Sequence, residues 1–134
     1  MKKVWIVLAI LVLVLIALFL SAYLIATAPM NTGEFSLDEF AWEIENFAFQ
    51  GDQTYGEIDG WREAAKIGKN VIAEHYEAYS EGSLLEWMGC SVKYDAQNDV
   101  YYVRTFHLTP FMMGGAYDVI LRADGTVVAL WGEK

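Results

Sequence analysis

The two histidines are the first residues to consider for catalysis, because an imidazole ring titrates near neutral pH and serves as acid, base or metal ligand. His75 and His107 lie outside any standard catalytic motif: the chain has no HExxH zinc motif, no glycine-rich phosphate loop and no nucleophile elbow. No pair of carboxylates stands out from the acidic background. We therefore predict that the protein is not an enzyme and uses no cofactor and no metal.

An acidic helix face beside His75 is the one pattern that suggests a metal site. Glu74, Glu77 and Glu81 follow one another at i, i+3 and i+7, so they share a face of a predicted helix. In a chain with eighteen Asp and Glu against nine Lys and Arg, such a face is typical of a solvated surface. We interpret these glutamates as solvent-exposed and His75 as a residue at the edge of an apolar stripe.

Cys90 is the only cysteine, so no intrachain disulfide is possible. In the segment Met88-Gly89-Cys90-Ser91-Val92, strand alternation places the thiol on the same side as Met88 and Val92. We expect a buried and unreactive side chain. An intermolecular disulfide or a nucleophilic role is the alternative.

Residues suited to binding a protein are more prominent than residues suited to catalysis. Phe111, Met112 and Met113 lie in a loop between two predicted strands, where apolar side chains either fold back onto the core or face a partner. Methionine in particular suits adaptable contact surfaces. Trp131 and Asp118, on the mixed face of the last predicted hairpin, extend this candidate partner-binding surface. The other tryptophans that could extend it are Trp42 and Trp87.

Any such surface acts beside a membrane, because residues 4–26 form an apolar run without Asp, Glu, Lys or Arg. A helix of this length spans about 30 Å, the thickness of the hydrocarbon core of a bilayer. Lys2 and Lys3 precede the run and no basic residue closely follows it, so the positive-inside rule predicts a cytoplasmic N-terminus. We expect residues 1–28 to form a single-pass anchor in the cell membrane, with residues 29–134 outside the cytoplasm.

Cleavage of this run as a signal peptide is the alternative. Ala26-Thr27-Ala28 has the small-x-small pattern of a cleavage site, but Pro29 follows it, and proline fits poorly just after a scissile bond. The apolar run is also longer than the about 7–15 residues typical of a signal peptide. These features favour an uncleaved anchor over a protein secreted after cleavage near Ala28.

Net charge narrows the choice of partner. Lys2 and Lys3 are two of the nine basic residues, so residues 29–134 hold the other seven together with all eighteen acidic residues, for a net charge of −11. Such a surface disfavours nucleic acid and anionic lipid, both of which require clustered Lys and Arg. It permits a basic protein partner. Simple solubility explains the same charge without any partner.

Two amphipathic helices are predicted after a short linker, residues 29–35. The first begins at Ser36, which forms a capping box with Glu39. Its apolar stripe consists of Phe40, Ile44 and Phe47. The second runs from about Trp61 to Tyr79, with Asp59 as its N-cap. Its apolar face consists of Trp61, Ala64, Ala65, Gly68, Val71, Ile72, Tyr76 and Tyr79. The glycine on that face indicates close approach to another element rather than a helix break.

From Ser83 the hydrophobic period changes from 3.6 to 2, which predicts four antiparallel strands. We expect these strands at residues 85–94, 100–107, 116–123 and 126–131. Together with the two helices they form one acidic domain over residues 36–134.

The register of the last two strands follows from the Asp-Gly pair at 124–125, which predicts a two-residue hairpin loop. That loop places Val119 opposite Leu130 and Leu121 opposite Val128, so these four residues form one apolar face. The other face is mixed and consists of Asp118, Ile120, Arg122, Val127, Ala129 and Trp131. A sheet with one apolar face needs a cover, which the two helices supply. We therefore predict an α+β domain of two layers, two helices packed on a four-stranded antiparallel meander.

The part of the chain from about residue 59 to residue 134 has a distinctive order of segments. A helix WREAAKIGKNVIAEHY precedes a sheet containing YDAQNDVYYVRTF, and the chain continues with GGAYDVILRADGTVVALWGEK. This order resembles the small immunity proteins with a nuclear-transport-factor-2-like fold found in bacterial polymorphic toxin systems. The resemblance implies a cystatin-like half-roll of helix and sheet, and a protein that neutralises a cognate toxin by binding it. It brings no catalytic residues.

These observations favour a membrane-anchored, non-catalytic binding protein of the immunity type, with a protein partner such as a basic toxin. The alternative is a structural or regulatory accessory module of a bacterial envelope complex. A small-ligand-binding domain is a third and less favoured interpretation, because the sequence shows no convergence of polar groups on a pocket. The sequence does not determine the oligomeric state.

Overall fold

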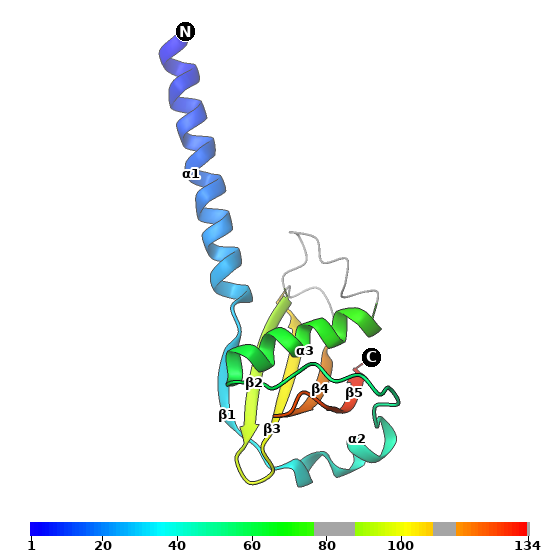
Figure 1. The fold of residues 1–134 in the computed structure, drawn as a ribbon. Helices are drawn as coiled ribbons and strands as arrows, with labels where there is room; N and C mark the ends of the chain where they lie inside the picture. Colours follow the sequence, from blue (N-terminus) through cyan, green and yellow to red (C-terminus); the bar gives the residue numbers. More distant parts are fainter. Residues whose placement is uncertain (77–87, 109–114, 134) are drawn as a thin grey trace.

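The computed structural model describes residues 1–76, 88–108 and 115–133, and the class is α+β, as predicted (Figure 1). The elements, in chain order, are α1 (Lys2–Thr27), β1 (Met30–Glu34), the 3₁₀ helix η1 (Leu37–Phe40), α2 (Ala41–Asn46), α3 (Trp61–His75), β2 (Met88–Asp95), β3 (Val100–His107), β4 (Tyr117–Arg122) and β5 (Val127–Gly132).

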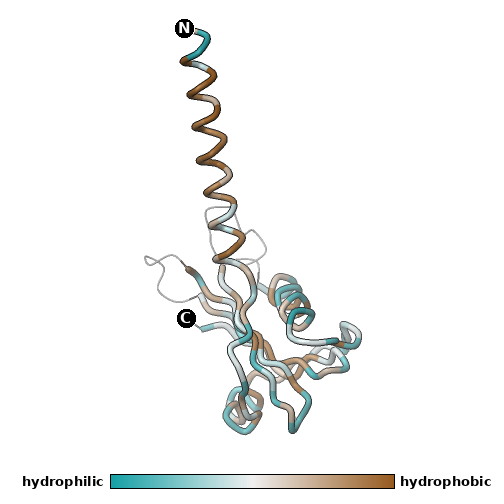
Figure 2. Tube along the Cα trace, turned by 90° about the vertical axis from the view of Figure 1, so that its left-hand side faces the viewer, coloured by the Kyte–Doolittle hydropathy of each residue, from teal (hydrophilic) through white to brown (hydrophobic). Residues whose placement is uncertain are grey.

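The N-terminal helix α1 projects away from the rest of the molecule. It has 26 residues, none of which is buried, and its surface is apolar along almost its whole length (Figure 2). The helix is therefore long and apolar enough to cross a membrane, in agreement with the sequence.

The sheet has five strands in the order β1-β2-β3-β4-β5, with β1 parallel to β2 and the other pairs antiparallel. The antiparallel meander of four strands is confirmed over the described residues, and β1 is an addition to it. β1 occupies most of residues 29–35, which the sequence analysis assigned to a linker. All five of its residues are exposed. The strand is held by backbone pairing with β2 and by the Thr32 hydroxyl, which donates to the Val92 carbonyl at 3.2 Å. Because no apolar side chain of the strand is buried, it has no alternating apolar pattern by which it could be recognised.

The β4–β5 hairpin differs from its prediction by one residue. The pair Val119–Leu130 is confirmed, but the register shifts between Ile120 and Leu121, so Leu121 lies opposite Val127 rather than Val128. The connection is longer than two residues: the Arg122 amide donates to the Thr126 carbonyl at 2.8 Å, and Gly125 adopts a φ of +87°. The extra residue moves Val127 onto the α3 face and Val128 onto the opposite face.

α3 covers one face of the sheet and buries most of the face predicted for it. Its buried residues are Ala64, Ala65, Ile67, Gly68, Val71 and Ile72. The helix ends at His75, before the predicted Tyr79, which lies outside the described residues. Its N-cap is Gly60, with a φ of +101°, rather than Asp59, whose backbone amide instead donates to the Glu63 carboxylate at 2.7 Å.

The opposite face is covered by η1 and α2, so the two predicted helices do not share one side of the sheet (Figure 2). The capping box of Ser36 and Glu39 is confirmed, but it begins a 3₁₀ turn followed by a helix of six residues with no buried residue. Asp95 holds this segment to the sheet, because its carboxylate accepts the Leu37 amide at 2.8 Å. The two-layer prediction was wrong because the face classed as mixed is also largely apolar. Its buried core is Phe35, Val100, Tyr102, Ile120, Ala129 and Trp131.

Gly68→Ala is expected to destabilise the domain. A Cβ at this position would lie 2.7–2.9 Å from three side-chain atoms of Val103, which is itself fully buried and has no room to move. Overpacking of this kind costs about 1–3 kcal/mol, against about 1 kcal/mol that alanine contributes over glycine inside a helix. Urea denaturation of the full chain in detergent micelles, followed by near-UV circular dichroism, measures the change.

Asn70→Ala is the matched control, because Asn70 is exposed on the same helix and its replacement adds helix propensity without a clash. Val103→Ala in the Gly68→Ala background should recover part of the lost stability. A Gly68→Ala protein as stable as Asn70→Ala would contradict the close approach of α3 to β3.

Candidate functional site

Two of the residues singled out from the sequence, Asp118 and Trp131, lie side by side on the face covered by η1 and α2. They are cross-strand partners on β4 and β5. Both are buried: Asp118 has no exposed surface and Trp131 is 7% exposed. Neither side chain offers a contact surface to a partner in this conformation. The correction has a simple physical cause, since strand alternation assigns a residue to a face but does not say whether that face is covered.

Asp118 belongs to a network of polar side chains inside the domain. The Tyr102 hydroxyl donates to Asp118 Oδ1 at 2.5 Å, and Arg104 Nη1 lies 3.4 Å from the same oxygen. The Arg104 guanidinium also binds Glu133 in bidentate fashion, at 3.0 and 2.6 Å. Strand alternation explains the grouping, because Tyr102 and Arg104 are two residues apart on β3 and Arg104 lies directly opposite Asp118.

Burial dominates the electrostatics of this network. Loss of water raises the pKa of Asp118 to about 6, although the Tyr102 hydrogen bond and the Arg104 charge act in the opposite direction. Burial likewise raises the pKa of Tyr102 well above its usual value, with the Asp118 carboxylate adding to the effect. Asp118 Oδ2 is buried and has no hydrogen-bond partner among the described residues. The carboxyl group therefore binds a proton more tightly than an aspartate in water does.

A perturbed carboxylate is often the mark of a catalytic site, but the surroundings of Asp118 argue for a structural role. A catalytic acid or base must reach the substrate within hydrogen-bond distance. Asp118 has no exposed atom, and the aromatic rings of Phe40, Tyr102 and Trp131 pack together on this face. The network joins β3, β4 and the end of β5 inside the domain and does not present a reactive group.

Aromatic rings lead from this buried network to the surface. Tyr102 stacks against Trp131, with ring centroids 6.3 Å apart, and Trp131 stacks against Phe47, also at 6.3 Å. Phe47 meets Trp42 edge to face at 5.7 Å. We call these four residues the aromatic row. Exposure rises along it, since Phe47 is 39% exposed and Trp42 is 63% exposed.

The aromatic row changes the list of candidate contact residues. Trp42 was a possible extension of the surface, whereas Phe47 was assigned to a buried stripe. The signal for Trp42 is its position off that stripe, which turns its ring away from the core. The loop residues Phe111, Met112 and Met113 lie outside the described residues, so their assignment stays a prediction. The same holds for Trp87.

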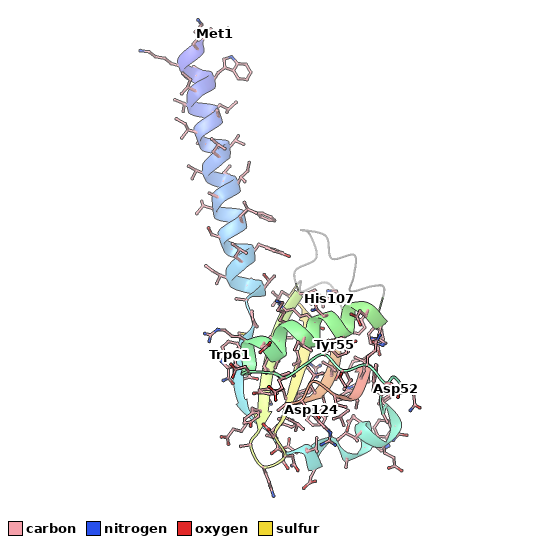
Figure 3. All side chains as sticks on the ribbon, in the orientation of Figure 1. Met1, Asp52, Tyr55, Trp61, His107 and Asp124 are labelled. Atoms are coloured by element: carbon pink, nitrogen blue, oxygen red, sulfur yellow. The ribbon has the colours of Figure 1, made fainter. Side chains whose placement is uncertain are left out.

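The other chemistry-bearing residues form no second site in the described part of the chain. Cys90 is fully buried and burial raises the pKa of its thiol to about 11, as expected for an unreactive side chain. His75 Nδ1 pairs with the Val71 carbonyl at 2.7 Å, and Glu74 accepts the Tyr55 hydroxyl at 2.6 Å. His107 lies at the end of the sheet nearer α1 (Figure 3).

Within residues 1–76, 88–108 and 115–133, no group of three or more His, Cys, Asp or Glu side chains is arranged to hold a metal ion. Glu77 and Glu81 of the acidic face lie outside these ranges. No protein-family model, curated protein or solved structure matches the chain. Function must therefore be inferred from the geometry of the chain itself.

Asp118→Asn is expected to change how stability depends on pH. The folded pKa of about 6 exceeds the ordinary value of 3.8, so the native state binds the proton more tightly between these values. The stability that Asp118 contributes is thus fully present below about pH 4 and is lost as pH rises to about 6. The asparagine that replaces Asp118 does not titrate, so the variant should become more stable relative to wild type across this window, by roughly 3 kcal/mol.

Denaturation of both proteins at a series of pH values measures this difference. Tyr102→Phe serves as a second variant, because it keeps the ring but removes a hydrogen bond that lowers the pKa of Asp118. The pKa of Asp118 should be higher still in this variant, so its stability should continue to fall up to a higher pH than that of wild type. Parallel stability profiles for wild type and Asp118→Asn would contradict the raised pKa.

Proposed function

We propose that the chain is a single-pass membrane protein whose N-terminus is cytoplasmic and whose residues 29–134 form a binding domain outside the cytoplasm. The observation that carries this proposal is α1, an apolar helix of 26 residues with no buried residue. Such a helix in water would expose its whole apolar surface, whereas a bilayer would cover it and leave its backbone hydrogen bonds intact. Lys2 and Lys3 at its start support the orientation.

Binding accounts for the rest of the domain better than catalysis does. Among the described residues, Asp118 is the carboxyl whose pKa is raised most; it has no exposed surface, and the thiol of Cys90 is buried. Trp42 and Phe47, by contrast, are exposed, and so are the carboxylates of Asp38, Glu39 and Glu45 on the same segment. Exposed aromatic groups of this kind are typical of protein contact surfaces.

The kind of binding that we propose is neutralisation of a toxin. α3 followed by β2, β3, β4 and β5 has the helix-then-meander order that supports a nuclear-transport-factor-2-like half-roll and its immunity-protein role. Residues 29–134 have a net charge of −11, which suits a basic toxin because complementary charge speeds encounter. An accessory role in a bacterial envelope complex is the second candidate, favoured by the anchor itself.

The orientation is tested by a reporter fused after Lys134. Alkaline phosphatase folds only outside the cytoplasm and should be active, whereas a green fluorescent protein fused at the same position should stay dark. The fusion should remain in the membrane fraction after a high-salt wash. A fluorescent fusion would place the domain in the cytoplasm, and a soluble protein lacking residues 1–28 would show that α1 is a cleaved signal peptide.

The immunity role is tested by co-expression with toxins encoded beside the gene, each directed outside the cytoplasm. The full chain should restore growth against one of them. A chain in which Met alone replaces residues 1–28 should not, because it stays in the cytoplasm with its domain intact. If no toxin is neutralised and envelope components co-purify instead, the accessory role replaces the immunity role.

A further inference from the structure

Trp42 and Phe47 form an exposed aromatic pair on the face covered by η1 and α2. Beyond residues 1–28, the exposed large hydrophobic side chains of the described residues are Met30, Trp42 and Phe47. The two rings contact each other edge to face, and the ring of Phe47 also stacks on the buried ring of Trp131. The Leu130 amide also donates to the Phe47 carbonyl at 3.2 Å. The pair is therefore held in place before any partner arrives, which lowers the entropy lost on binding.

The chain segment that carries the pair has charge of one sign. Residues 37–47 contain four Asp and Glu and no Lys or Arg. Glu45 follows Trp42 by three positions on α2, so the two are neighbours on the helix surface, and Asp38 is exposed on the preceding turn. An aromatic ring with acidic neighbours attracts a cation to its face. Trp61 already has the Arg62 guanidinium 4.5 Å from its ring, whereas η1 and α2 contain no basic residue that could cover Trp42.

A lipid bilayer and a second copy of this chain are two other partners that could cover the pair, and both are disfavoured. α2 lies at the end of the domain opposite α1, far from a bilayer entered by α1 (Figures 1 and 2). Anionic lipid would in any case be repelled by the acidic surface. A second copy of this chain would bring another domain with a net charge of −11, and like charges at an interface oppose association.

We infer that Trp42 and Phe47, with Asp38 and Glu45, form the docking surface for a basic segment of a protein partner. A Lys or Arg of that segment lies over Trp42, and a neighbouring apolar side chain packs against Phe47. This inference rests on the proposed binding function and names the chemistry of the partner.

The test uses the full chain in phosphatidylcholine nanodiscs and a fluorescein-labelled peptide, KFKGKFKG, followed by fluorescence anisotropy. Empty nanodiscs correct for lipid binding, and the peptide EFEGEFEG should not bind. Trp42→Ala should weaken binding of the basic peptide about tenfold, since it removes the ring that holds the cation. Asp38→Asn with Glu45→Gln should weaken it severalfold and flatten its dependence on salt.

The matched control is Glu34→Gln with Glu57→Gln, which removes two exposed acidic charges from other parts of the domain. Its net charge equals that of the Asp38 and Glu45 variant, so its affinity should stay within about twofold of wild type. An equal loss of peptide affinity in both double variants, or no loss of affinity in Trp42→Ala, would overturn the docking surface. So would failure of the basic peptide to bind wild type. Circular dichroism confirms that each variant is folded.

The same variants separate this inference from the proposed function. Trp42→Ala should lose protection in the toxin assay, whereas the Glu34 and Glu57 control should keep it. Full protection by Trp42→Ala would leave the immunity role standing and overturn the surface. A chain that binds the peptide as expected but neutralises no toxin would leave the surface standing and overturn the immunity role.

Discussion

Burial of both faces of one sheet is the constraint from which the rest of the domain follows. α3 covers one face closely enough that position 68 has no space for a Cβ. η1 and α2 cover the other face with Phe40 and the neighbouring Phe35. Because both faces of the central strands are covered, a buried polar side chain there must be satisfied from within. Tyr102 and Arg104 do this for one oxygen of Asp118, and the charge of Arg104 is in turn shared with Glu133 at the rim.

Two segments that the strand pattern does not predict, β1 and the residues before α3, cover the two edges of the meander. β1 closes the β2 side, and it leads directly from α1, so a hydrogen-bonded strand joins the membrane-length helix to the domain. On the other side, Phe49 and Tyr55 donate backbone hydrogen bonds to Val128 and Gly125. The segment before α3 thus covers the edge of β5 and its turn, which leaves less free backbone for aggregation. The same pairing fixes the backbone at Phe47. The hydrogen bonds that protect the edge of β5 therefore also fix the position of the exposed aromatic pair.

What the sequence predicts and what it does not can be traced to the kind of signal each element carries. α1 is a continuous apolar run and α3 has a strong apolar period, and the capping box at Ser36 marks its turn correctly. β1 has no period to detect, because its side chains are all exposed. The Asp-Gly pair at 124–125 suits more than one loop length, and the longer loop moves Val128 to the other face. Trp131 and Asp118 were placed on the right face, but only the path of residues 35–47 over that face buries them.

The buried network and the exposed pair are parts of one arrangement. Trp131 has Tyr102 on one side and Phe47 on the other, so the ring that packs beside the Asp118 network also positions the ring that supports Trp42. A buried carboxyl with one unpaired oxygen lowers stability, and natural proteins retain such groups where they specify one arrangement over others. The docking surface that we infer for Trp42 and Phe47 needs rigid support of this kind, because a few ordered contacts must do what a large flexible interface would otherwise do.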